Sequence, residues 1–183
     1  FGLLGEDGKE LKSGMILINK LTKTVTFENL NSKPTPSWFR GFSAPIKINS
    51  NLSLNQKIFL ASNDTDSFNR WDNLQELWLE YILNNQKTDN KQFFEMIKTF
   101  FEKDTDFALL SEMISLPSEQ IIYQNVIKID VEEVCHKLNH SILSVAENLR
   151  ELFFETYHKL NFKKDFDLSS ESIGERALKN KCL

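Results

Sequence analysis

Two histidines spaced four residues apart are the side chains of this chain best placed for metal chemistry. His136 and His140 would lie on one face of a helix, which is how zinc peptidases present two imidazoles to a metal ion. The local sequence is His-Lys-Leu-Asn-His, so Lys137 stands where such a peptidase has its general-base glutamate. Its ammonium group opposes cation binding and proton abstraction, and Cys135 would point about 100° away. We therefore predict a solvated helix face and no metal site.

A second candidate is the acidic sequence Asp64-Thr65-Asp66, which is similar to the start of a calcium-binding loop. Such a loop has glycine at its sixth position and glutamate at its twelfth. Here the sixth residue is not glycine and the twelfth is Gln75. We interpret the acidic residues as a helix N-cap and first turn.

Nucleophilic catalysis and phosphate binding find no support. Ser43 and Ser118 do not lie in the glycine-flanked sequence motif of a nucleophile elbow. The chain has only three histidines, so few residues could serve as the base of a Ser-His-acid triad. None of the six glycines forms a phosphate-binding run, since Gly5 and Gly8 enclose an acidic turn that would repel phosphate. We predict no catalytic and no cofactor-binding residue in this chain.

An aromatic cluster could form a stacking platform for a ligand. It consists of Trp38, Phe39 and Phe42. Packing at a domain junction is the favoured interpretation, and we expect Trp38 and Phe42 to be largely buried. Arg40 and Arg70 lie near tryptophans in the sequence, and each could form an ion pair or stack on an indole.

The composition excludes several classes of partner. The net charge is −4, with 22 basic and 26 acidic residues mixed along the chain, so no cluster of positive charge predicts nucleic-acid binding. Apolar runs such as Phe107–Leu110 are far shorter than the roughly 20 residues that span a bilayer. We expect no nucleic-acid partner and no membrane segment.

Cysteine usage favours a reducing compartment. Cys135 and Cys182 are far apart and do not form the disulfide framework of a small secreted domain, so we expect a cytoplasmic protein. We attribute to chance the three Asn-x-Ser/Thr matches, which are at Asn51, Asn63 and Asn139.

The first 50 residues predict β structure. Strand-forming sequences occur at Met15–Ile18, Leu21–Phe27 and Pro45–Asn49, and Gly5–Gly8 predicts a tight turn in which Gly8 takes a positive φ. The nearby prolines favour an edge position for their segment. Four or five short strands are too few for a sandwich of about seven, so we expect the missing strands to precede Phe1.

From Leu52 onward the apolar residues recur at helical spacing. The helix expected from about Ser67 to Gln86 would place an aromatic-rich face in the core. That face comprises Trp71, Leu74, Leu77, Trp78, Tyr81 and Ile82.

Further helical signals follow. A phenylalanine-rich segment is succeeded by a short helix near Phe107–Ile114 and a break at Leu116–Ser118. The longest periodic stretch predicts a helix over Val131–Leu160, and Asp130 is its expected N-cap. A last helix should begin at Ser169 or Ser170. The apolar stripe of the helix over Val131–Leu160 comprises Val134, Leu138, Ile142, Val145, Leu149, Leu152, Phe153, Tyr157 and Leu160.

These patterns predict a mixed fold, β and then α. We expect a partial immunoglobulin-like β-sandwich over residues 1–51, followed over residues 52–183 by the N-terminal part of a multi-helix α domain arranged as a helical array.

Four sequence blocks, in this order, carry a resemblance to a known family. They are Trp38–Pro45, Phe68–Asp72, Leu116–Ser118 with Ile129–Asp130, and Arg176–Cys182. The chain resembles the aminopeptidase N family, bacterial zinc aminopeptidases of the gluzincin class. The resemblance implies a fragment that starts inside the β-sandwich domain following the metallopeptidase domain and stops inside the C-terminal helical domain.

The resemblance also implies what the parent protein does. That enzyme would remove N-terminal residues from peptides, using one zinc held by a H-E-x-x-H helix and a distant glutamate, with a G-A-M-E-N strand binding the free amine. None of these motifs occurs here, so no catalytic, cofactor or metal residue is carried over. The segment itself is expected to be an inactive scaffold in which the sandwich joins the helical domain that limits access to the active site.

Two further possibilities stay open. The chain could be a stand-alone helical interaction module whose aromatic-rich face binds another protein. A cut sandwich would also expose a strand edge, which favours self-association of the fragment.

Overall fold

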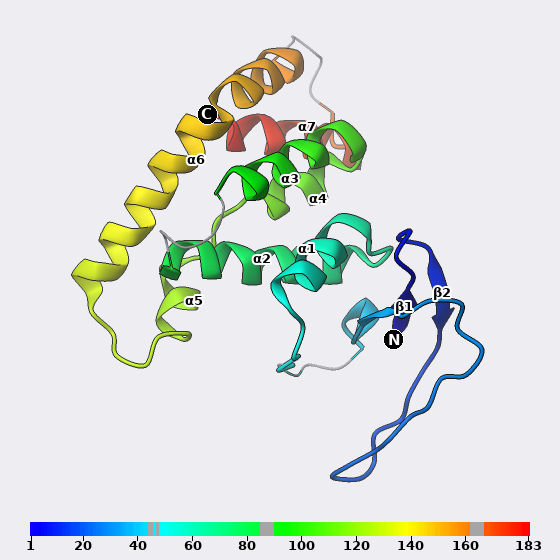
Figure 1. Ribbon diagram of the computed structural model, residues 1–183. Helices are drawn as coiled ribbons and strands as arrows, with labels where there is room; N and C mark the ends of the chain where they lie inside the picture. Colours follow the sequence, from blue (N-terminus) through cyan, green and yellow to red (C-terminus); the bar gives the residue numbers. More distant parts are fainter. Residues whose placement is uncertain (44–45, 47, 85–89, 162–166) are drawn as a thin grey trace. The chain divides into compact units, whose positions relative to one another are not determined.

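The computed structural model describes residues 1–43, 46, 48–84, 90–161 and 167–183. The chain forms two compact units, Phe1–Leu74 and Gln75–Leu183. Three strands and a short 3-10 turn precede seven α-helices in the part of the chain that is described (Figure 1). None of those helices is both long and apolar enough to cross a bilayer. The order of elements confirms the predicted mixed fold.

A small antiparallel sheet opens the first unit. Its strands are β1 (Gly2–Leu4), β2 (Glu10–Ser13) and β3 (Thr35–Ser37), in the spatial order β2-β1-β3. Central strand β1 is fully buried. The predicted turn between β1 and β2 is confirmed, because Gly8 donates its N–H to the Gly5 carbonyl at 2.9 Å and has a φ of 77°. Edge strand β3 holds Pro36, in keeping with the missing amide donor of proline.

Two predicted strands are wrong. Residues 15–18 and 21–27 form no strand and belong to a long loop between β2 and β3 (Figure 1). Strand propensity gives a strand only where a neighbouring strand pairs with its backbone and a second layer covers its apolar side chains. Met15 and Leu21 are instead exposed. The third predicted strand, Pro45–Asn49, lies partly outside the described residues.

Two helices follow the sheet. Helix α1 (Leu54–Asn63) begins with a capping box, in which the Ser53 hydroxyl accepts from the Gln56 amide and the Gln56 side chain accepts from the Ser53 amide. Helix α2 (Ser67–Asn84) confirms the predicted start at Ser67. Its predicted core face is buried from Leu74 to Ile82, whereas Trp71, the first residue of that face, is only half-buried. The predicted end of the helix at Gln86 lies outside the described residues.

The remaining helices confirm most of the helical pattern. They are α3 (Asn90–Lys103), α4 (Phe107–Met113), α5 (Glu119–Tyr123), α6 (Val131–Leu160) and α7 (Ser170–Lys181). Helix α6 has the predicted bounds, and the Asp130 carboxylate caps it by accepting from the Glu133 amide at 3.1 Å. Ser169 caps α7. The one-turn helix α5 was not predicted, because five residues carry no periodic signal.

Aromatic side chains fill the core of the second unit. The Trp78 and Phe93 rings meet edge to face with centroids 4.7 Å apart, and Tyr81 stacks on Phe93 at 5.3 Å. The polar atoms of these rings are satisfied: Trp78 Nε1 donates to the Met113 carbonyl at 3.0 Å, and the Tyr81 hydroxyl donates to Ser144 Oγ at 2.8 Å. These bonds fix how α2, α4 and α6 approach one another in this unit.

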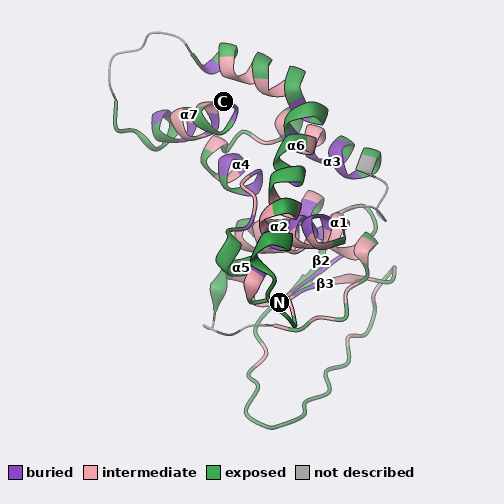
Figure 2. Ribbon diagram, turned by 90° about the vertical axis from the view of Figure 1, so that its left-hand side faces the viewer, coloured by how far each residue is buried: buried purple, intermediate pink, exposed green. Residues whose placement is uncertain are grey.

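Much of α6 is exposed (Figure 2). Of its predicted apolar stripe, Val134, Val145, Leu149 and Leu160 are buried, but Ile142 is 46% exposed. The long helix is therefore covered only at intervals.

Helices α4 and α7 pack through a glycine. A Cβ atom on Gly174 would lie 2.8 Å from the backbone nitrogen of Ala108 and 3.4 Å from its Cβ. Since the nearest atom belongs to a helix backbone, it cannot rotate away, and the two helices can be this close only with glycine at position 174.

We expect Gly174→Ala to lower the free energy of unfolding. Overpacking costs about 1–3 kcal/mol, which exceeds the gain of roughly 0.5–1 kcal/mol from replacing a helical glycine. Urea unfolding followed by circular dichroism measures the change. Asn180→Ala, at an exposed position of the same helix, is the matched control and should change stability little; a stabilised Gly174→Ala protein would contradict the close contact.

Candidate functional site

A turn with left-handed backbone lies between β3 and α1 in the first unit. Around the 3-10 turn η1 (Arg40–Phe42), the φ angles of Phe39, Gly41 and Phe42 are 55°, 66° and 49°. Left-handed backbone at the two phenylalanines costs on the order of 1–3 kcal/mol each. The surrounding contacts must offset that cost.

Arg40 supplies most of these contacts. Its Nη2 lies 2.7 Å from Asp64 Oδ1, its Nε donates to Ser37 Oγ at 3.0 Å, and its Nη1 pairs with Glu10. The Asp64 side chain is fully buried and that of Arg40 is 15% exposed. The guanidinium packs directly on β1, since a Cβ atom added at Gly2 would clash with Arg40 Cζ. One side chain thus ties all three strands to the end of α1.

The acidic residues after α1 act as caps, as predicted. Asp64 Oδ1 accepts from the Asp66 amide at 3.0 Å, and Asp66 Oδ1 accepts from the Asn69 amide at 2.9 Å in the first turn of α2. Asp66 Oδ2 also accepts from the Gly41 amide at 2.8 Å, which holds the strained turn. Three of these four carboxylate oxygens bind backbone amides or Arg40, which favours the capping interpretation over a calcium loop. Asp64 Oδ2 is the one buried side-chain polar atom in the described part of the chain without a hydrogen-bond partner.

Glu10 responds to the same network. The pKa of its carboxyl group lies below its ordinary value of 4.5, because the Ser13 hydroxyl and then Arg40 donate to the carboxylate. A lowered pKa in the folded state means that Glu10 stabilises the fold above pH 4.5. This stabilisation is lost as the pH falls through the lowered pKa.

The two arginines form polar contacts. Arg40 forms ion pairs, which confirms that alternative, and Arg70 Nε donates to the Ala61 carbonyl at 3.2 Å near the end of α1. The predicted burial of Phe42 is wrong, since it is 55% exposed and has its ring 5.0 Å from that of Phe68. The left-handed turn directs Phe42 outward. Trp38 is only partly buried.

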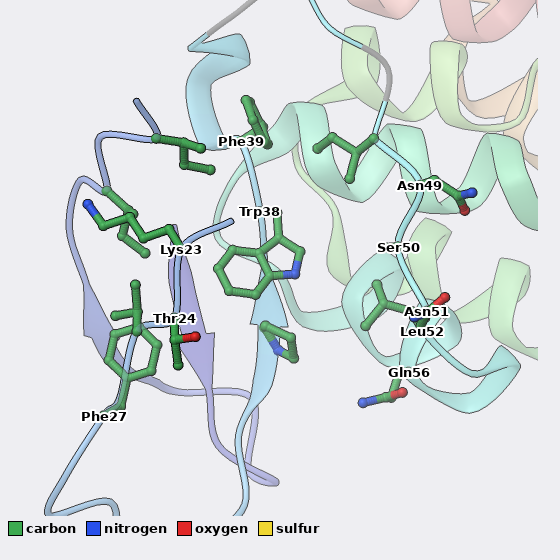
Figure 3. A pocket seen from close by; sticks show the side chains of 15 residues that line it. Lys23, Thr24, Phe27, Trp38, Phe39, Asn49, Ser50, Asn51, Leu52 and Gln56 are labelled. Carbon is green, nitrogen blue, oxygen red and sulfur yellow. The ribbon is translucent and has the colours of Figure 1, made fainter. Parts of the chain in front are cut away.

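A pocket of about 730 Å³ lies beside Trp38 (Figure 3). Figure 3 shows the indole between two segments of the first unit, one holding Lys23 and Phe27 and the other running from Asn49 to Gln56. Among the described residues that line the pocket, Lys23 alone is charged, and its Nζ donates to the Leu17 carbonyl at 2.6 Å. The walls are mainly apolar and include no paired acid and base. Such a pocket can pack against apolar groups.

The two histidines lie on a solvent-exposed part of helix α6. His136 and His140 are exposed on α6, and Lys137 Nζ pairs with Glu133 Oε1 at 2.6 Å. Among the residues described, no group of three or more His, Cys, Asp or Glu side chains could hold a metal ion. Ser43 and Ser118 are both exposed. The zinc of an aminopeptidase does not fit these residues.

Two models of protein families match adjacent parts of this chain. Residues 1–51 match a domain of unknown function, DUF3458, described as an Ig-like fold. Residues 54–183 match a second one, DUF3458_C, described as ARM repeats. The Ig-like description agrees with the predicted partial sandwich, and the ARM repeats with the predicted helical array.

Similar whole proteins are longer than this chain. Aminopeptidase N of Caulobacter vibrioides is 24% identical over 99% of this chain and 22% of its own length, and that of Escherichia coli is 26% identical over 93% and 21%. The crystal structure of Legionella pneumophila aminopeptidase A in complex with aspartic acid matches with a TM-score of 0.84 and 25% identity, over 99% of this chain and 23% of that chain. The chain therefore spans about a fifth of the length of these relatives.

Breaking the ion pair from one side should be costly. Arg40→Met leaves the Asp64 carboxylate buried without its cation, and we expect it to lower the free energy of unfolding by about 3–5 kcal/mol. Adding Asp64→Asn removes the buried charge but keeps an acceptor for the Asp66 amide, so the double variant should recover at least half of the loss. Urea unfolding followed by tryptophan fluorescence gives both values.

The matched control for this pair is Arg150→Met, at an exposed arginine, which should change stability by less than about 0.5 kcal/mol. A loss below about 1 kcal/mol in Arg40→Met, or no recovery in the double variant, would show that the pair does not hold the unit together.

The two free cysteines should differ in reactivity. Burial raises the pKa of Cys182 to about 11 from an ordinary 9.0, which lowers its thiolate fraction at pH 8 roughly 100-fold. We expect iodoacetamide to alkylate partly exposed Cys135 first in the native protein, as read by mass spectrometry of peptides. Both thiols should react alike in urea, and equal native rates would contradict the burial of Cys182.

Proposed function

The chain belongs to the DUF3458_C family over residues 54–183, and because it is homologous to a part of aminopeptidase N, we propose that it is a non-catalytic scaffold segment of a zinc aminopeptidase. The observation that carries this proposal is the use of its polar side chains. Arg40, Asp64 and Asp66 hold backbone turns and helix ends, and Lys137 pairs with Glu133 along a helix face. Groups committed to such contacts are not available as acids, bases or ligands.

The reaction of the whole protein is part of the same proposal. It would remove N-terminal residues from peptides, which reach a catalytic domain outside this segment. Zinc would activate the attacking water there. We place the metal outside this segment, since Lys137 lies between His136 and His140 and no third ligand joins the two histidines among the described residues.

Composition and cysteine content support a proposal about the partners and the cellular location of the protein. We propose that the protein meets neither nucleic acid nor membrane, because its charges are mixed and its apolar runs are short. A cytoplasmic location is supported by the free thiols of Cys135 and Cys182.

A second candidate function is a helical module that binds another protein. Exposed apolar side chains of α6, among them Ile142 and Phe154, favour this alternative. A complete gene sequence separates the two functions, because a H-E-x-x-H motif upstream of Phe1 supports the enzyme and a natural start near Phe1 supports the module.

We expect the purified chain to hydrolyse neither alanyl nor leucyl amides and to retain no stoichiometric zinc after dialysis. Hydrolysis needs a metal-activated water and a general base, and the described part of the chain provides no ligand set for the metal. Aminopeptidase N of Escherichia coli, assayed at the same molar concentration, is the positive control. Turnover near that of the control, or zinc near one equivalent that is lost in His136→Ala, would contradict the scaffold assignment.

A further inference from the structure

The hydrogen-bonded ladder between β1 and β2 extends one step beyond the two strands. Phe1 N donates to the Gly14 carbonyl at 2.8 Å, and Gly14 N donates to the Phe1 carbonyl at 3.0 Å. The two residues therefore form an antiparallel pair of the hydrogen-bonded kind, next to the pair of Gly2 and Ser13. A polypeptide joined to the amino end of Phe1 would continue this ladder along Met15–Ile18.

The segment after Gly14 has the backbone of an unpaired strand edge. Along an antiparallel strand, every second residue turns both its N–H and its C=O toward the partner, and after Gly14 these residues are Ile16 and Ile18. Neither of them makes a backbone hydrogen bond to another described residue. The Leu17 carbonyl belongs on the opposite side of the strand, and it accepts from Lys23 Nζ at 2.6 Å. The side that would meet a partner strand is thus the open one.

The side chains of the same segment alternate as they do in a strand. Ile16 and Ile18 line the pocket of about 730 Å³ beside Trp38, whereas Met15 and Leu17 do not line it and are 92% and 71% exposed. Ile18 is itself 64% exposed, so the pocket leaves much of its side chain uncovered. One face of an extended segment therefore borders an open apolar pocket.

The register of the ladder selects the polypeptide before Phe1 as the occupant. That polypeptide is attached at the residue that already pairs with Gly14, and it reaches Met15–Ile18 without a change of direction. On the other side of β1, the chain after β3 turns away at Phe39, whose φ is 55°. Figure 3 shows the space that remains beside Trp38, between two segments of the first unit.

On the premise of the proposed function, in which this chain is a segment of a longer enzyme, we propose that the residues immediately before Phe1 lengthen β1 and bind Met15–Ile18 as an antiparallel strand. The aminopeptidase N relatives have such a length of chain, because this sequence covers only 21–22% of them. In the register of the existing ladder, the first residue before Phe1 faces Met15 and the fourth faces Ile18. This is strand addition, in which main-chain hydrogen bonds give affinity and alternate side chains give specificity.

The register also states which side chains of the added strand become buried. Residues opposite each other in an antiparallel pair lie on the same face of the sheet. The second and fourth residues before Phe1 therefore enter the pocket beside Trp38, together with Ile16 and Ile18. Both positions should hold apolar residues, β-branched ones above all.

The lengthened strand makes the entrance to this segment rigid. Gly2 of the same strand packs under Arg40, which pairs with the buried carboxylate of Asp64. A catalytic domain joined through this strand is held to the sheet by ladder hydrogen bonds, whereas a flexible linker would leave its direction free. The first unit thereby sets the direction in which the preceding domain leaves the scaffold.

Hydrogen exchange of single amides, read by mass spectrometry with electron-transfer fragmentation, tests the proposal on this chain and on the complete gene product. We expect the Ile16 and Ile18 amides to exchange at least about tenfold more slowly in the complete protein, because each donates to the added strand. The Leu17 amide points away from that strand and should change less. This alternation distinguishes a paired strand from a surface that is merely covered.

Ile16→Ser and Leu17→Ser are matched variants on the two faces of the segment. In the complete protein Ile16 is buried against the added strand, so Ile16→Ser should lower the thermal midpoint there more than it does in this chain. Leu17→Ser replaces an outward side chain and should lower the midpoint little in either protein.

Three results would overturn the proposal. They are equal exchange of Ile16 and Ile18 in the two proteins, equal slowing of Ile16, Leu17 and Ile18, and slowing in this chain alone that increases with its concentration, which would assign the edge to a second copy. The gene sequence separates the strand from the enzyme. Polar residues at the second and fourth positions before Phe1 contradict the strand, whereas a missing H-E-x-x-H motif contradicts the proposed function and leaves the exchange result to decide the strand.

Discussion

The buried ion pair between Arg40 and Asp64 is the interaction on which the first unit depends. Three strands of three or four residues are too small a sheet to be stable alone. Removing both charges from water costs several kcal/mol per ion, and good geometry with further hydrogen bonds must offset that cost. Arg40 also donates to Ser37 and Asp64 Oδ1 also accepts from the Asp66 amide, which offset part of that cost, while Asp64 Oδ2 has no hydrogen-bond partner in the described part of the chain. Because the same guanidinium packs on Gly2, the sheet and the α1–α2 turn form together.

The second unit is built on a different principle. Its core is aromatic, and the only polar atoms carried inward by its large rings, Trp78 Nε1 and the Tyr81 hydroxyl, have partners among the described residues. The energetic gain there scales with buried apolar area and needs no charge to be desolvated. Small residues decide how near the helices come, as Gly174 does against Ala108. We therefore expect the first unit to be most sensitive to substitutions at Arg40. We expect the second unit to be most sensitive to substitutions of its buried apolar and small residues.

The sequence predicted the features that depend on residues close together in the chain and missed those that depend on residues far apart. The bounds of α6 and its cap at Asp130 were predictable, because a 30-residue period and a capping carboxylate are local properties. The capping role of Asp64 and Asp66 was predictable for the same reason. The choice of Asp64 as partner of Arg40 was not, since 24 residues separate them and only the folded sheet brings them together. The expected strands at 15–18 and 21–27 were wrong because β pairing depends on neighbours that propensity does not reveal.

The same distinction applies to the polar side chains of the candidate site. Residue types that catalyse reactions are also those that cap helices and join turns, and a sequence alone cannot say which task a carboxylate performs. Here the structure assigns Asp66 to two backbone amides and Glu133 to Lys137. What these contacts leave available for function is surface, and on α6 that surface is apolar at Ile142 and Phe154 and basic at Arg150. In a helical array each repeat buries its apolar face against a neighbouring repeat.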